Sequence, residues 1–240
     1  MGSFYYFGHV KGNQPALGDE FYSKVLPVMF ISALIWFGTC LYFGGYLWAP
    51  AYDYALLSMD KIVVYLIVYV VAWFLLLIFC FLRVNVIAAG LFFVISGITG
   101  FFMGLLLMYV SESLTLEVAR SLFLTSTLLA LGASAAAMSL GLALKDRIAK
   151  HYCLIFMLFG LFYTIFEVLM IVIFGYNNLI IDLLMFGYIF AVMVFDTATL
   201  PGKIQRGYWM MAAVDLFFDF VTMLIRIFIL LVASSGRSRR

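Results

Sequence analysis

The last apolar stretch of the chain, Tyr208 to Val232, is long enough to cross a lipid bilayer and yet carries three charged residues. An ionisable group at the centre of a membrane helix costs about 2.5–3.5 kcal/mol on insertion scales, so such groups are rare and tend to be functional. At about 100° per residue, Asp215, Asp219 and Arg226 fall on one side of a helix, with Thr222 between them. This pattern predicts a helix that lines an ion or proton path, or a buried polar core, inside a membrane protein.

The composition also indicates an integral membrane protein. Of the 240 residues, 67% are hydrophobic and 11% are charged, and the mean hydropathy is +1.16, which no soluble globular domain matches. The net charge of +2 is too small to indicate a nucleic-acid partner. Cys40, Cys80 and Cys153 are too dispersed for a disulfide framework or a metal cluster, so we interpret them as core thiols. We expect the lipid bilayer as the main surrounding and no resident cofactor.

Seven apolar segments can be read against the roughly 20 residues that a membrane-spanning helix needs. They are Val25–Trp48, Ile62–Leu82, Val84–Val110, Ser121–Leu144, Tyr152–Phe174, Leu179–Phe195 and Tyr208–Val232. The sequence therefore predicts an all-α integral membrane protein, a bundle of seven transmembrane helices with the seventh at its centre. A polar segment over residues 1–24 precedes the membrane domain over 25–233, and a basic tail follows over 234–240.

The charges between the segments favour a cytoplasmic amino terminus. That side then holds most of the basic residues, namely Lys11, Lys24, Arg83, Lys145, Arg147, Lys150, Lys203 and Arg206. The other side holds only Lys61 and Arg120. Seven full crossings would place the basic tail outside. Two alternatives follow: the tail is translocated despite its charge, or the seventh segment is partly re-entrant and does not fully cross.

Small residues recur every four positions in the third and fourth segments. The two stripes are Ser96, Gly100 and Gly104, and Ala133, Ala137 and Gly141. Such stripes let helix backbones approach closely in lipid. They predict that these two helices contact each other or the seventh helix.

Asp196 and Asp219 lie on successive apolar segments and form the candidate ion and proton site. Two carboxylates that are close together in a low dielectric share a proton and titrate as a pair. Such a pair holds a proton in acid and a cation when ionised, and its oxygen ligands suit Ca²⁺. His9 and His151 both lie outside the apolar segments, so pH sensing at membrane depth must use carboxylates.

The remaining charges in or beside the apolar segments have two interpretations each. Arg83 is either a latch that bridges Asp196 and Asp219 or an arginine that snorkels to the interface. Glu167, in the fifth segment, is a further ion ligand or a protonated, hydrogen-bonded carboxyl. We expect Asp215 and Arg226 to be accessory polar residues of the same site. The alternative is that the aspartates only pair with the arginines and hold helices together.

Three runs of the sequence resemble the Bax inhibitor-1 family, the transmembrane BAX inhibitor motif group. Phe195-Asp196-Thr197 resembles the Tyr-Asp-Thr-Gln end of that family's sixth helix. The run from Asp215 to Val221, Asp-Leu-Phe-Phe-Asp-Phe-Val, resembles its seventh-helix pattern. The fourth segment resembles it at Phe123-Leu124-Thr125, Ser139-Leu140-Gly141 and Lys145-Asp146-Arg147.

The resemblance implies a seven-helix bundle with the last helix at its centre and a pH-sensitive calcium leak. It matches Asp196 and Asp219 to the family's paired aspartates, and Arg83 to the second-helix arginine that latches them when they are ionised. The sequence departs from the family at Ala198, where a glutamine is usual, and over Tyr69–Phe74, where a glutamate is common.

We therefore expect a calcium-permeable leak channel, and no enzyme, that opens when the Asp196–Asp219 pair is protonated. Its transported species are calcium ions and protons. One alternative is a non-conducting interaction protein that modulates a membrane protease or a cell-death or stress regulator. Another is a proton-coupled calcium exchanger that uses the same carboxylates in alternation.

Two intramembrane protease classes are not expected. The Gly-x-Gly-Asp motif of aspartyl intramembrane proteases is absent around Asp215 and Asp219, and a rhomboid-like serine protease needs a histidine within the membrane. For the location, we expect the plasma membrane in a bacterial host and an endomembrane in a eukaryotic or viral one.

Overall fold

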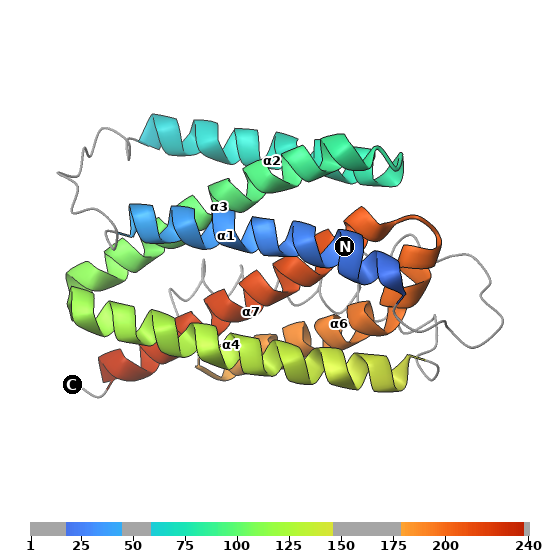
Figure 1. Ribbon diagram of the computed structural model, residues 1–240. Helices are drawn as coiled ribbons and strands as arrows, with labels where there is room; N and C mark the ends of the chain where they lie inside the picture. The colour runs from blue at the N-terminus through green and yellow to red at the C-terminus, as the bar shows by residue number, and fades with distance from the viewer. Residues whose placement is uncertain (1–17, 45–58, 146–178, 238–240) are drawn as a thin grey trace. The chain divides into compact units, whose positions relative to one another are not determined.

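The computed structural model describes residues 18–44, 59–145 and 179–237, and each regular element over these residues is a helix (Figure 1). In chain order they are the π-helical turn η2 (Phe21–Val25), α1 (Leu26–Phe43), α2 (Met59–Phe81), α3 (Asn85–Leu114), α4 (Leu116–Leu144), α6 (Leu179–Gln205) and α7 (Trp209–Arg237). The predicted fifth segment, Tyr152–Phe174, lies outside the described residues together with Glu167. Six of the seven predicted segments are therefore helices, and the count of seven stays a prediction.

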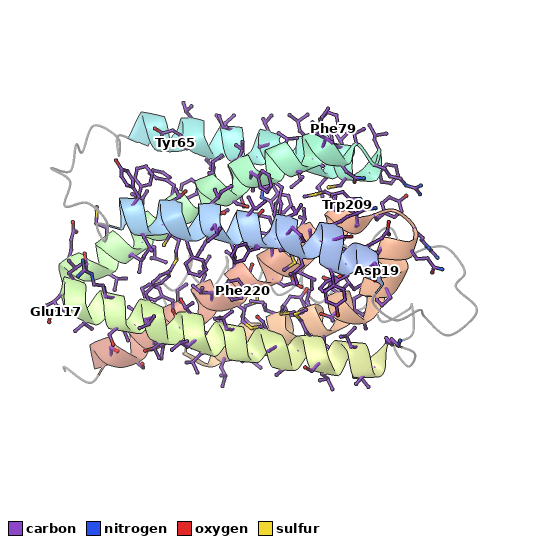
Figure 2. All side chains as sticks on the ribbon, viewed as in Figure 1. Asp19, Tyr65, Phe79, Glu117, Trp209 and Phe220 are labelled. Carbon is purple, nitrogen blue, oxygen red and sulfur yellow. The ribbon has the colours of Figure 1, made fainter. Side chains whose placement is uncertain are left out.

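Six helices of the described part are long and apolar enough to cross a membrane. Large apolar side chains are exposed on them, among them Phe30 on α1, Phe74 on α2 and Leu128 on α4, each more than 60% exposed. Figure 2 shows the side chains that stand out along α2 between Tyr65 and Phe79. In water such surfaces would drive aggregation, whereas lipid covers them at no cost. The chain is an all-α, multi-pass membrane protein, as the composition predicts.

The helices fall into two compact units. The first contains α1, α2, α3 and the residues Gly207–Val214 at the start of α7. The second contains α4 from Ser121, α6, and α7 from Asp215 onward. Helix α7 therefore contributes its first residues to the first unit and the rest to the second.

Small residues of α3 hold the first unit together. A Cβ at Gly100 would collide with the backbone carbonyl oxygen of Trp36 on α1, and one at Gly104 would lie 3.0 Å from the carbonyl oxygen of Cys40. The predicted stripe is thus a helix contact, but its partner in the structure is α1. Next to it, the Phe101 ring of α3 packs edge-on against Phe43 of α1, with centroids 4.8 Å apart.

A tight turn joins α2 to α3 at Arg83, the residue that separates the second and third predicted segments. The Arg83 N–H donates to the Cys80 carbonyl at 3.2 Å, and the Val84 N–H donates to the Phe79 carbonyl at 2.9 Å. These two bonds define a Schellman motif, whose left-handed residue is usually glycine. Here that residue is Arg83, with φ of 60°. A left-handed conformation costs a non-glycine residue about 1–2 kcal/mol. Contacts of the Arg83 side chain must therefore offset this cost.

The second unit packs α4 against both α6 and α7. A Cβ at Gly141 would lie 2.5 Å from the Val194 carbonyl oxygen of α6. The Ser134 hydroxyl lies 3.7 Å from the Met223 sulfur of α7. Gly141 of the fourth-segment stripe therefore contacts α6, and the predicted contact with the seventh helix is made beside the stripe, by Ser134.

Helix α6 corrects the predicted end of the sixth segment. We expected that segment to stop at Phe195, before the polar run that begins with Asp196, but the helix continues for ten further residues to Gln205. Two of the polar side chains have partners inside the fold: the Thr199 hydroxyl donates to the Asp196 carbonyl at 3.0 Å, and Asp196 has an ion-pair partner described below. Charged and hydroxyl side chains do not end a membrane helix when most of them find partners inside the protein.

Helix α7 is continuous from Trp209 to Arg237. Its apolar span of 27 residues corresponds to roughly 40 Å of helix, enough for a full crossing. A re-entrant segment would need a break, and residues 209–237 contain none. The seventh segment is thus one helix over 209–237, and whether it crosses the membrane fully stays a prediction.

Candidate functional site

Four of the predicted site residues lie in the second unit. Asp196 is on α6, and Asp215, Asp219 and Arg226 are on α7. Asp196 is 4% exposed, which is unusual for a carboxylate in any protein. A buried charge needs a partner of opposite charge and a set of hydrogen bonds to be tolerated.

The partner of Asp196 is Lys203, which is 5% exposed and lies on the same helix. The Lys203 Nζ lies 2.7 Å from Asp196 Oδ1 and 2.7 Å from Asp215 Oδ2. One ammonium group therefore donates to two carboxylates, one from α6 and one from α7. We call these three residues the charge cluster. Two carboxylates and one ammonium give the cluster a formal charge of −1 when all three are ionised.

The helices position the cluster through simple spacing. Asp196 and Lys203 are seven residues apart, or two helical turns, so their side chains share one face of α6. A short connection between Gln205 and Trp209 then turns the chain into α7. Asp215 lies in the second turn of α7, which places it beside the last turns of α6. The cluster is therefore near the end of both helices where they are joined.

Asp219 lies one turn beyond Asp215 along α7. Its Oδ2 is buried and has no hydrogen-bond partner among the described residues. We expected Asp219 to be the main partner of Asp196 and Asp215 to be accessory. In the structure, Asp215 is the residue that shares a cation with Asp196, and Asp219 contributes a further buried carboxylate oxygen deeper along α7.

Arg83 lies in the first unit, at the turn between α2 and α3. Its Nη2 donates to the Tyr208 hydroxyl at 3.3 Å, and its guanidinium carbon lies 4.6 Å from the centre of the Tyr208 ring. These contacts offset part of the cost of an arginine at the left-handed position of the turn. The role of Arg83 as a latch for the aspartates stays a prediction. Arg226 is half-buried on α7.

Lys203 is the residue that the sequence analysis missed. The sixth segment is predicted to end at Phe195, which places Lys203 among the charges between the segments. The signal that identifies it is its spacing from Asp196. The two are seven residues apart, which places them on one face of a helix if the helix continues past Phe195.

The two carboxylates of the cluster are paired with the ammonium group of Lys203. Among the residues that the structure describes, no three carboxylate, histidine or cysteine side chains are arranged to bind a metal ion. The ammonium group of Lys203 lies between the two carboxylates instead. Calcium binding at Asp196 and Asp219 stays a prediction.

Fold and cluster together define a class: a multi-pass helical membrane protein with charged groups inside its spanning helices. Comparisons with protein-family models, with curated proteins and with solved structures return no match.

Proposed function

We propose that this protein is a leak channel for cations, calcium among them, that is gated by protonation of the carboxylates on α6 and α7. The observation that supports this most is the charge cluster of Asp196, Lys203 and Asp215 inside two helices of membrane-spanning length. Ionisable residues within spanning helices are costly to insert and tend to mark ion or proton paths. Helices can be packed together without buried charges, as the close approach of α3 to α1 at Gly100 demonstrates.

In the proposed mechanism, the ionised carboxylates hold Lys203 and close the path. Protonation of Asp196 or Asp215 weakens a charge-assisted hydrogen bond to the ammonium group, so the open state becomes more populated in acid. Asp219 offers the next oxygen along α7 for a cation that passes the cluster. Carboxylate oxygens suit a hard cation such as Ca²⁺.

The complete bundle in this proposal has seven helices with α7 at its centre. This arrangement and the calcium leak are those that the resemblance to the Bax inhibitor-1 family implies. Arg83 would then act as an additional latch on Asp196 or Asp219. The membrane would be the plasma membrane in a bacterial host, or an endomembrane in a eukaryotic or viral one.

The test is calcium flux into proteoliposomes that hold the purified full chain, measured from mildly acidic to mildly basic pH. We expect flux that rises in acid, and Asp196→Asn or Asp219→Asn should abolish it or remove its pH dependence. Glu112→Gln is the matched control, because Glu112 is an exposed carboxylate at the end of α3. Absence of flux above that of empty liposomes, with folded protein, would exclude the channel.

A second candidate function is that of a non-conducting protein that binds another membrane protein. Lys203 neutralises much of the charge of its two partners, as a purely structural ion pair does. In this case, the wild type gives no flux, although substitutions in the cluster still destabilise the fold. A proton-coupled calcium exchanger differs from both, since its flux would require a proton gradient and would stop when the gradient is collapsed.

A further inference from the structure

The position of Lys203 has a consequence for what the two carboxylates can bind. Its ammonium lies 2.7 Å from an oxygen of each, where a bound cation would lie if Lys203 were elsewhere. With both carboxylates ionised, the site without Lys203 would carry a charge of −2. That charge matches a divalent cation, whose preferred ligands are carboxylate oxygens.

The segment that carries Lys203 is a weak point of α6. Pro201 lies inside the helix, and it has no N–H to donate to the carbonyl of Thr197, four residues earlier. The Thr197 side-chain oxygen is also buried without a hydrogen-bond partner among the described residues. Gly202 follows immediately and lowers the cost of bending the backbone. Movement of the last turn of α6 away from Asp196 would break the two hydrogen bonds of Lys203, but one backbone hydrogen bond fewer than in a helix without proline.

We propose that Lys203 is a tethered competitor: its ammonium occupies a divalent-cation site formed by Asp196 and Asp215, and a cation binds there only when Lys203 withdraws. This inference rests on the proposed function, because it describes how a passing cation is kept off the path. It makes Lys203, more than Arg83, the residue that keeps the leak small. It also makes Asp215 a ligand of the site and not an accessory residue.

The direct test is calcium binding by the purified full chain in detergent, measured through its thermal unfolding midpoint. In Lys203→Gln the two carboxylates lose their internal cation, so saturating calcium should raise the midpoint by about 5 °C. Wild type and Lys203→Arg, which keep a cation in the site, should shift far less. A calcium response of Lys203→Gln no larger than that of wild type would overturn the proposal.

The matched control is the double variant Lys203→Gln with Asp215→Asn. It carries the same formal cluster charge as the wild type, namely −1, but it has only one carboxylate, so its midpoint should not respond to calcium. An equal response in the double and single variants would place calcium elsewhere and overturn the proposal. Magnesium tested in parallel separates a site for divalent cations from a site that prefers calcium.

Folding of Lys203→Gln can itself be used as a measurement. The variant is solubilised and purified in parallel in millimolar calcium and in a chelator, beside the double variant. Recovery of folded Lys203→Gln in calcium only would support the proposal. Misfolding in both conditions, with the double variant recovered folded, would contradict it, because the paired carboxylates would then accept no external cation.

Flux measurements separate this inference from the proposed function. If the proposal holds, Lys203→Gln raises the calcium flux severalfold over wild type. Flux by the wild type with no calcium binding and no increase in Lys203→Gln overturns the tethered competitor and leaves the channel. Calcium binding by Lys203→Gln with no flux from any variant leaves the site and excludes the channel.

Discussion

Both units of this protein use close helix approach at a glycine, but among the described residues the second unit also holds a buried charge cluster. In the first, α1 and α3 approach until the Gly100 backbone touches that of Trp36, and aromatic rings fill the space beside them. In the second, α6 and α7 are joined by an ammonium group between two carboxylates. Among the described residues, every charged side chain that is buried belongs to the second unit.

The comparison shows that helix packing alone does not require buried charged residues. Close backbone contact at small residues is sufficient to associate helices in lipid, and it desolvates no charge. A buried ion cluster gains little net stability over an apolar replacement, yet it becomes expensive when one member is removed. The second unit thus carries a cost that the first avoids, which is why we place the function there.

The largest expected effect is that of Lys203→Met, which leaves two buried carboxylates without their cation. We expect a loss of about 3–5 kcal/mol in the free energy of unfolding, since removal of one partner strands the other charges. Asp215→Asn should lose much less, because it leaves a neutral Asp196–Lys203 pair. Reversible unfolding in mixed detergent micelles, followed by tryptophan fluorescence, measures both.

If the three residues of the cluster only made incidental contacts, the two variants would not rank in this order of stability loss. If Lys203→Met and Asp215→Asn cost the same, the charge balance described above does not govern stability. The triple variant Asp196→Asn, Lys203→Met and Asp215→Asn is the sharper control, because it strands no charge. It should recover most of the stability lost by Lys203→Met.

Glycine substitutions test the packing contacts of both units. Gly100→Ala and Gly141→Ala place a methyl group against the backbone of a neighbouring helix, and we expect each to destabilise the protein by about 1–3 kcal/mol. The matched controls are Gly90→Ala on α3 and Gly132→Ala on α4, where a Cβ meets nothing within 4 Å. These should be neutral or stabilising by about 0.5–1 kcal/mol, because alanine favours the helix.

The same unfolding assay decides the result. Equal effects of Gly100→Ala and Gly90→Ala would show that the close approach of α3 to α1 contributes nothing to stability. A large effect confined to the first unit would show that the close approach of Gly141 to Val194 contributes nothing to stability.

The sequence predicts the helices of this protein better than it predicts the site. The lengths of the apolar segments were sufficient to predict six helices and the break between α2 and α3 at Arg83, because each of these signals is local. The contact of Lys203 with Asp215 is not local, since it depends on how α6 and α7 pack. The end of the sixth segment was predicted at Phe195 from its polarity, so the helical stretch that carries Lys203 was missed. The small-residue stripes predicted contacts, but only three-dimensional packing identifies α1 and α6 as the partners.

The smallest expected effect concerns the Arg83–Tyr208 contact in the first unit, which is exposed to solvent. Tyr208→Leu removes both the ring and the hydroxyl and should cost about 0.5–1 kcal/mol, the usual strength of an exposed cation–π contact. Tyr208→Phe keeps the ring and should cost less than half as much. Arg83→Gly is the informative companion, because glycine removes the strain of a φ of 60° while it also removes the contact. If Arg83→Gly is more stable than wild type, the arginine is kept at a cost in stability, and that cost is the expected signature of a latch. If Arg83→Gly and Tyr208→Leu are equally destabilised, the contact with Tyr208 accounts for Arg83 without a latch.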